Sequence, residues 1–379
     1  MLGLMAAAGL LAAASPGDPT RGLRAATPTP TLLARAAPAG PRACSVTAAP
    51  WGSDRRGRGT PRQPYRTLRR LARALRPGQT GCLRAGTYGN LRNWADLRVS
   101  GRRGRRVTIR SYPGETATVL GYVVLEGSYL TVAHLRIDGS NRLYRHHPAG
   151  IACPAPVSQP LVIAGHDDTL QYDDYFQSVP SLRSTGIGIG FWSQADNTVI
   201  RYSKIHDVGQ CQAYDHLIYL SHGNNVQIYD NWLYDDAHGR GVQLYPALTN
   251  ARVFDNVIDH VGEGFVIGDE GGAVPRGNRI YNNIVLDALG LPTEHIRGQA
   301  IHDIYGGAPG TGNVFFDNDV FADPAGIGDL TAVRRYGNFA LAPGFINAAA
   351  HDYRLSAGSR LLTRGRRWTS LRVGAAGAP

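Results

Sequence analysis

Two stretches of the sequence, residues 214–219 and 236–245, hold the densest set of side chains that could do acid–base chemistry. We take four of them as candidate catalytic residues: His216, Tyr219, His238 and Arg240. A guanidinium stays charged and binds a carboxylate through two hydrogen bonds, which acidifies the proton on the neighbouring carbon. An imidazole can remove that proton near neutral pH, and a phenol can protonate the leaving oxygen. The set therefore predicts β-elimination from a polyuronate.

Four polar neighbours are candidate substrate-binding residues: Asp215, Gln243, Tyr245 and Glu263. The two carboxylates among them permit a second interpretation, because an inverting glycosidase needs one acid for the glycosidic oxygen and one base for water. Each of these residues taken alone is explained as well by a solvated outer surface, and the clustering is what favours a site.

Internal repetition indicates how the chain positions these side chains. Five segments can be overlaid, and they begin at residues 199, 227, 252, 279 and 314. One column of the overlay contains Ser203, Asn231, Asn256, Asn283 and Asn318, at steps of 28, 25, 27 and 35 residues. Apolar residues alternate on both sides of this column, which is the period of a β-strand. A unit of this length is typical of one turn of a coil of short parallel strands.

Such a coil gives the asparagines a structural role, because stacked side-chain amides can hydrogen-bond from one turn to the next. A second strand precedes each repeat. In it we expect one inward-pointing column made of Ile187, Ile218, Val242, Val266 and Ile301. Asp303 falls in the neighbouring inward column and interrupts it.

Residues 65–75 predict a short amphipathic helix that ends at Pro77-Gly78. One face of this helix carries Leu68, Leu71, Ala72 and Leu75. The first turn of a coil exposes both its core and a strand edge, so we expect this helix to cap it.

The N-terminal region predicts export. Residues 1–14 are apolar and end in small residues, as a signal peptide does, although no Lys or Arg precedes them. Residues 15–43 are rich in Ala, Pro, Thr and Arg and predict a disordered linker, which leaves a β-helix domain at 44–379. No stretch is long enough to span a bilayer, and we expect a secreted, extracellular protein.

The cysteine count agrees with export. Cys44, Cys82, Cys153 and Cys211 allow three disulfide pairings, of which we favour Cys44–Cys82 and Cys153–Cys211. Their spacing is not that of a zinc site.

The formal charge of +11 is unevenly distributed. Residues 42–110 carry 18 Arg and two Asp, a balance of +16, whereas residues 111–379 carry 18 Arg, one Lys and 26 acidic residues, a balance of −7. The basic stretch also lacks interleaved aromatic residues, so we do not expect nucleic-acid binding.

Several further motifs are distinctive: PGQTGCLRAGTY at 77–88, IRSYPGE at 109–115, PGFI at 343–346 and DYRLSAGS at 352–359. Together with the asparagine repeats, they resemble secreted right-handed parallel β-helix proteins of the pectate-lyase-like superfamily, over roughly residues 44–363. The resemblance implies an all-β fold, a right-handed parallel β-helix (solenoid) with a short N-terminal capping α-helix. It does not imply one activity, since the superfamily includes polysaccharide lyases, glycoside hydrolases, esterases and non-catalytic proteins.

The spacing between turns of the coil, ~4.8 Å, limits which residues can act together. His216 and Arg240 are expected one turn apart, whereas Tyr219 and His302 are three turns apart, which favours a structural role for His302. Asp215 and Glu263 would lie about 10 Å apart, marginal for inversion.

Many lyases with this fold use calcium. The chain lacks an acidic column, and its weak candidate ligands for Ca²⁺ are Asp235, Asp236, Asp269 and Glu270.

We therefore expect a monomeric, secreted carbohydrate-active enzyme that cleaves an extracellular polysaccharide, with β-elimination of an acidic glycan favoured. An inverting glycoside hydrolase is the alternative enzyme. A non-catalytic glycan-binding or cell-surface structural protein is the alternative from another class.

Overall fold

The computed structural model describes residues 43–142, 159–182, 187–191, 195–209, 215–270, 272–305 and 310–363, which all belong to one compact unit. The expected signal peptide, the linker up to residue 42, Cys153 and Cys211 lie outside the described residues. No helix in these ranges is long and apolar enough to cross a membrane.

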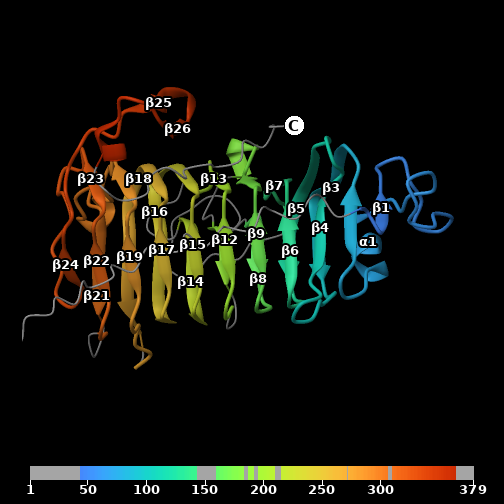
Figure 1. The fold of residues 1–379 in the computed structure, drawn as a ribbon, viewed down its shortest axis with the longest axis horizontal. Coiled ribbons are helices and arrows are strands. Elements are labelled where there is room, and N and C mark those ends of the chain that lie inside the picture. The colour runs from blue at the N-terminus through green and yellow to red at the C-terminus, as the bar shows by residue number, and fades with distance from the viewer. Residues whose placement is uncertain are drawn as a thin grey trace, which may run out of the picture. The chain divides into compact units, whose positions relative to one another are not determined.

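One wall of the fold is a sheet of 11 parallel strands, which lie side by side along the molecule (Figure 1). In spatial order its strands are β1 Val46–Ala48, β2 Thr80–Leu83, β4 Val107–Ser111, β6 Leu130–Ala133, β9 Thr169–Gln171, β12 Val199–Arg201, β15 Gln227–Tyr229, β17 Arg252–Phe254, β19 Arg279–Tyr281, β22 Val314–Phe316 and β24 Arg334–Tyr336. We call it the first sheet.

The second sheet has 13 strands, and its long members bend round a corner of the coil to supply the other two walls. Its strands are β3 Gly86–Leu97, β5 Ala117–Leu125, β7 Leu135–Asp138, β8 Leu161–Ile163, β10 Asp174–Phe176, β11 Ile187–Phe191, β13 Lys204–His206, β14 His216–Asn224, β16 Trp232–Thr249, β18 Val257–Asp269, β20 Ile284–Leu286, β21 Ile301–Tyr305 and β23 Asp319–Phe321.

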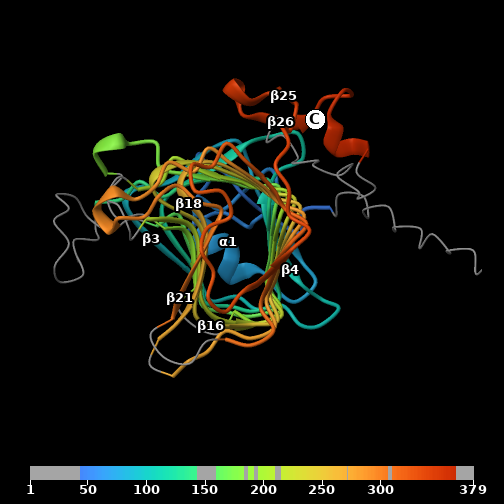
Figure 2. The same cartoon turned by 90° about the vertical axis from the view of Figure 1, so that its left-hand side faces the viewer.

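Seen along its axis, the coil encloses one continuous apolar core (Figure 2). Near the C-terminus lie the antiparallel pair β25 Phe345–Asn347 and β26 Asp352–Leu355 and the short 3₁₀ helices η3 Ala348–Ala350 and η4 Arg360–Thr363. Two further 3₁₀ helices are η1 Pro180–Leu182 and η2 Pro292–Glu294. The predicted fold, an all-β right-handed parallel β-helix, is confirmed.

The predicted capping helix is α1, Leu68–Ala74, which covers the N-terminal end of the coil (Figure 2). The Thr67 side chain caps it by accepting a hydrogen bond from the Arg70 N–H, as N-cap residues do. A Cβ on Gly81 of β2 would lie 2.4 Å from the Leu71 side chain. The helix therefore lies directly on the first coil, where Cys44 and Cys82 form the expected disulfide.

The asparagine column forms a ladder inside one corner of the coil. Asn231 Nδ2 donates to Asn256 Oδ1 at 3.0 Å, and Asn256 Nδ2 donates to Asn283 Oδ1 at 2.9 Å. Asn283 continues to Asn318, and Asn318 to Asn338, which the overlay did not include. A second ladder, in which Asn278 Nδ2 donates to Asn313 Oδ1, occupies another corner and was not predicted.

The expected inward column was wrong at two turns, by two residues at the first and by one residue at the second. Ile218 pairs with Ile189 instead of Ile187, and Val242 pairs with Phe265 instead of Val266. Phe265, Val266 and Ile267 are consecutive apolar residues, so alternation could not set their register.

Asp303 does interrupt an inward column, where it pairs with Ile267. Its buried carboxylate accepts hydrogen bonds from the backbone N–H groups of Thr331, Ala332 and Val333, at 2.7, 2.7 and 3.2 Å. The segment that carries these groups covers the last coil.

We predict that Asn256→Leu lowers the free energy of unfolding by about 3 kcal/mol, because it leaves several buried ladder groups without partners. Urea unfolding measures the change. Asn224→Leu is the matched control, since Asn224 is exposed and water can replace the hydrogen bonds that its Oδ1 accepts from Thr249 and Asn250, so that it should cost under about 1 kcal/mol. Equal losses in the two variants would contradict a structural ladder.

A second prediction concerns Asp168. One of its oxygens accepts from the Leu130 N–H at 2.8 Å, the other has no partner, and burial raises its pKa to about 7. A carboxyl whose pKa is higher in the folded than in the unfolded state loses stability as the pH rises from about 4 through that value.

Asp168→Asn should therefore raise the melting temperature more at about pH 8 than at about pH 4, measured by calorimetry. The exposed Asp329→Asn control should not show this difference. An equal shift of Asp168→Asn at both pH values would contradict the prediction.

Candidate functional site

Strands β14, β16 and β18 lie next to one another in the second sheet and place most of the candidate residues on neighbouring coils. His216 pairs with Arg240, and Arg240 pairs with Glu263, so these three residues occupy the same position on successive coils. Tyr219 pairs with Gln243, Gln243 with Val266, and Val266 with His302. The expected separations, one coil between His216 and Arg240 and three between Tyr219 and His302, are therefore present.

His216, Tyr219 and Gln243 form a contact group. His216 Nε2 lies 2.6 Å from Gln243 Oε1, a hydrogen bond in which the amide oxygen accepts. The His216 ring meets the Tyr219 ring edge-on, with the ring centroids 5.1 Å apart. His216 is nearly buried and Tyr219 is half-buried. We call these three residues together with Tyr245 the candidate row.

Tyr245 and Glu270 lie close enough to Tyr219 to affect its titration. Burial, followed by the charges of Tyr245 and Glu270, raises the pKa of Tyr219 to about 12. Burial and the nearby Glu270 and Asp269 also raise the pKa of Tyr245. Both phenols are therefore protonated at neutral pH and can serve as proton donors. Glu270 had been considered as a calcium ligand and not as a neighbour of Tyr219.

Arg240 does not present its charge to the surface. Its Nε lies 3.1 Å from Glu263 Oε2 and its Nη2 lies 2.6 Å from Glu294 Oε2. The Arg240 side chain is 6% exposed and that of Glu263 is fully buried. The carboxylate of Glu263, predicted to bind substrate, faces Arg240 and has no accessible surface, and the guanidinium of Arg240 is held by two carboxylates.

Sequence reasoning missed three members of this buried cluster. Gln299 Nε2 donates to Glu263 Oε1 at 2.7 Å, and His302 Nδ1 lies 3.2 Å from the same oxygen. The contact with Glu263 raises the pKa of His302. Glu294, in η2, closes the cluster from outside the coil. The sequence had placed His302 in the column of Tyr219 and Gln243, three coils from Tyr219, but the position of Glu263 one coil before His302 was not considered.

Asp215 and Asp236 form a buried pair of carboxyl groups beneath the site. Neither oxygen of Asp236 has a hydrogen-bond partner, and burial, with the charge of Asp215 second, raises its pKa well above the usual value. A Cβ on Gly239 would lie 2.5 Å from both side chains, so glycine is required there. Asp215, predicted to bind substrate, has no accessible surface in this structure.

The remaining candidates are dispersed. His238 is exposed, on the bend of β16 before Arg240, and has no hydrogen bond or ion pair within the described ranges. Asp235 is paired with His260 at 3.1 Å and His351 at 3.2 Å. Of the residues considered for Ca²⁺, Asp235 contacts two histidines and Asp236 is buried, and the described residues contain no group of three or more His, Cys, Asp or Glu that could hold a metal ion.

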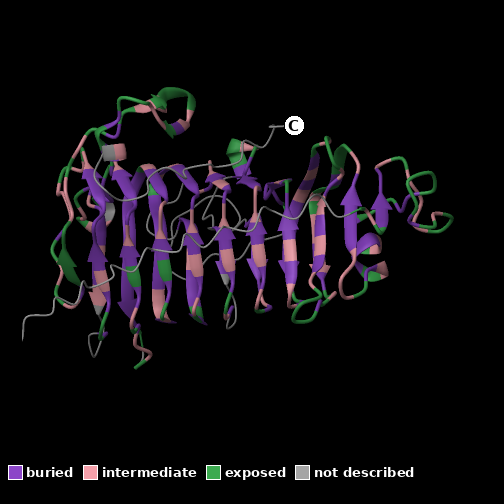
Figure 3. Ribbon diagram, in the orientation of Figure 1, coloured by how far each residue is buried: buried purple, intermediate pink, exposed green. Residues whose placement is uncertain are grey.

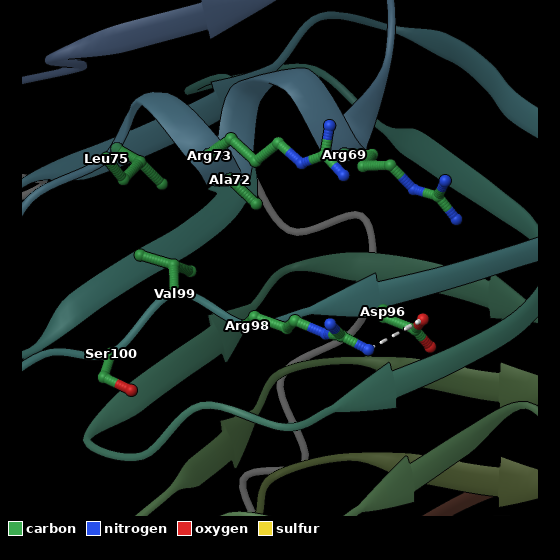
Figure 4. Close-up of a pocket in the computed structure, with 8 residues that line it drawn as sticks. All are labelled: Arg69, Ala72, Arg73, Leu75, Asp96, Arg98, Val99 and Ser100. Atoms are coloured by element: carbon green, nitrogen blue, oxygen red, sulfur yellow. Dashed lines mark ion pairs between the residues drawn. The ribbon is translucent and has the colours of Figure 1, made fainter.

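Two clefts on the described surface lie on elements other than the strands that carry the candidate row. One, of about 470 Å³, lies between α1 and the loop after β3; Arg69, Arg73, Asp96 and Arg98 line it (Figure 4). The other, of about 600 Å³, lies over strands β17, β19 and β22 of the first sheet.

Solved structures share this architecture. Pectate lyase Pel9A superposes with a TM-score of 0.54 at 15% identity, covering 84% of this chain and 91% of its own. An alginate lyase from Paenibacillus sp. str. FPU-7 matches with a TM-score of 0.48 at 17% identity, covering 73% and 95%. A GH136 lacto-N-biosidase from Eubacterium ramulus gives 0.47 at 14% identity, covering 78% and 68%.

No family model matches the sequence, and no curated protein matches it. The first superposition establishes the fold, which is that of the pectate-lyase-like β-helix proteins. At these identities the activity of the chain has to be argued from its own residues.

The burial of Arg240 leads to a prediction about stability. Arg240→Met leaves Glu263 buried without its cation and should lower the free energy of unfolding by about 3–5 kcal/mol in urea titrations. Arg297→Met, at an exposed guanidinium, is the control and should cost under about 0.5 kcal/mol. A small loss for Arg240→Met would show that the buried ion pair is absent.

Proposed function

We propose that the chain is a secreted enzyme that cleaves an acidic polysaccharide by β-elimination at the candidate row. The observation that supports this most is the contact group of His216, Tyr219 and Gln243, which offers an imidazole, a protonated phenol and an amide on two adjacent coils. These are the groups that elimination from a uronate requires: a base, an acid and a donor for the carboxylate.

Each residue has a separate task in this proposal. Gln243 Oε1 is occupied by His216, so its amide N–H₂ is the group left to hydrogen-bond the substrate carboxylate and stabilise the charge that develops beside it. Tyr219, protonated because its pKa is raised to about 12, donates its proton to the leaving glycosidic oxygen.

An imidazole takes the proton from the sugar carbon. His216 is the imidazole in ring contact with Tyr219, and His238 is the exposed one on the next coil. Arg240 is a positioning residue in this proposal. Its buried ion pairs with Glu263 and Glu294 hold the part of β16 that precedes Gln243.

Hydrolysis has weaker support. The carboxylates considered for inversion, Asp215 and Glu263, both have no accessible surface and cannot flank a glycosidic bond. Glycan binding without catalysis remains as the alternative from another class, and the same experiment distinguishes it.

The test is incubation with polygalacturonate, alginate and neutral glycans, followed by absorbance of unsaturated ends and by reducing-sugar assay. We expect unsaturated products from an acidic polymer and a loss of at least about 100-fold in kcat for Tyr219→Phe. Tyr112→Phe, at a tyrosine far from the row in sequence, is the control and should retain activity. Replacing His216 and His238 one at a time by Ala identifies the base. In the variant that lacks the base, kcat no longer falls at low pH through protonation of an imidazole.

Reducing ends without unsaturation would overturn elimination in favour of hydrolysis. Binding to a polymer with no product at all would overturn the enzyme proposal.

A further inference from the structure

The outer face of the first sheet carries a column of aromatic side chains, one on each coil. Strands β15, β17, β19, β22 and β24 place Tyr229, Phe254, Tyr281, Phe316 and Tyr336 in register. Their rings stack nearly parallel, with centroid separations of 4.8, 5.2, 5.0 and 5.0 Å. Partly exposed positions recur at matching levels of these neighbouring strands (Figure 3).

A column of arginines lies two residues before the aromatic column. Arg252, Arg279 and Arg334 are exposed and in register, with Val314 between the last two. None of the three guanidinium groups has a hydrogen bond or ion pair with a described residue. Arg279 lies over the Phe316 ring at 5.3 Å and Arg334 over the Tyr336 ring at 5.4 Å. We call the two columns the arginine–aromatic strip.

One acidic residue lies within the strip. Asp255 lines the same cleft and accepts a hydrogen bond from Asn282, and burial raises its pKa to about 6, which leaves it mostly ionised at neutral pH. Asp317, at the equivalent turn of a later coil, is buried. Three exposed guanidiniums therefore outnumber one partly buried carboxylate, and the strip is positive although residues 111–379 have a formal balance of −7.

We propose that the arginine–aromatic strip binds an acidic polysaccharide chain along the axis of the coil, on a different sheet from the candidate row. This rests on the proposed function for the choice of polymer. The 600 Å³ cleft lined by Arg252, Phe254, Arg279 and Tyr281 lies on this strip and offers guanidiniums to the carboxylates of a polyuronate.

The dimensions fit an extended polymer. Successive coils are ~4.8 Å apart, and a 1,4-linked pyranose chain advances by a similar distance for each sugar, so consecutive uronates can meet consecutive arginines. Nucleic acid fits less well, because bases bind to the open faces of aromatic rings, and these faces already stack on one another.

The basic cleft beside α1 is the weaker alternative. Its Arg98 pairs with Glu126 at 2.7 Å and lies 3.9 Å from Asp96, and Arg69 Nη2 donates to the Trp94 carbonyl at 2.6 Å (Figure 4). Two of its three guanidiniums are thus already engaged. The cleft supplies a matched control for charge.

The experiment measures binding of polygalacturonate to the full chain carrying Tyr219→Phe, by affinity electrophoresis and calorimetry. The double variant Arg252→Gln/Arg279→Gln removes two exposed cations and should weaken binding by about two- to thirty-fold. Arg69→Gln/Arg73→Gln removes the same charge at the cleft beside α1 and should leave the affinity unchanged. Fully methyl-esterified polygalacturonate should bind weakly to all variants.

Three results would overturn the proposal: equal weakening in both double variants, no weakening in Arg252→Gln/Arg279→Gln, or tighter binding of single-stranded DNA at the strip. Cleavage of short oligouronates is measured separately, on the chain that retains Tyr219, and tests the proposed function independently of polymer binding. If cleavage is absent but polymer binding depends on Arg252 and Arg279, the proposed function fails and the strip stands. If cleavage is normal and binding does not depend on these arginines, the strip fails alone.

Discussion

The structure depends on hydrogen bonding between successive coils. Each coil presents polar groups along the axis of the solenoid, and inside the corners these groups are out of reach of water. Asn231, Asn256, Asn283 and Asn318 meet this requirement because an amide can accept from the coil before it and donate to the coil after it. The ladder thereby fixes the position of each coil relative to the next, and His216, Arg240 and Glu263 occupy the same strand position on three successive coils.

The periodic features of the fold could be predicted from the sequence because they repeat. The asparagine steps, the alternation beside them and the apolar face of residues 68–75 are local patterns with one structural solution. The predicted strand register was wrong where apolar and polar residues do not alternate, at Phe265, Val266 and Ile267. The second ladder, at Asn278 and Asn313, was missed although each asparagine follows a glycine, Gly277 and Gly312, with positive φ.

The residue types of the candidate site and their separation in coils could be predicted from the sequence, but their exposure to solvent could not. Coil spacing correctly placed His216 one coil from Arg240. It could not show that Arg240 would be covered by Glu294, 54 residues further along the chain, since that contact depends on the path of η2 outside the regular strands. The same kind of irregular segment brings Glu270 beside Tyr219 and Tyr245. Periodicity identifies the column of a residue, whereas turns and short helices decide whether solvent reaches it.

The carboxylate of Asp303 has a consequence for the protein in concentrated solution. A solenoid that stopped at a bare strand would offer its final edge to any other extended chain, and molecules could add end to end into filaments. Asp303 fixes the backbone of residues 331–333 across the last turn, so an incoming strand would first have to displace three charge-assisted hydrogen bonds. At the opposite end α1 covers the first coil. The helix α1 and the segment held by Asp303 thus mark the two ends of the regular coil, although β24 of the first sheet keeps an exposed edge.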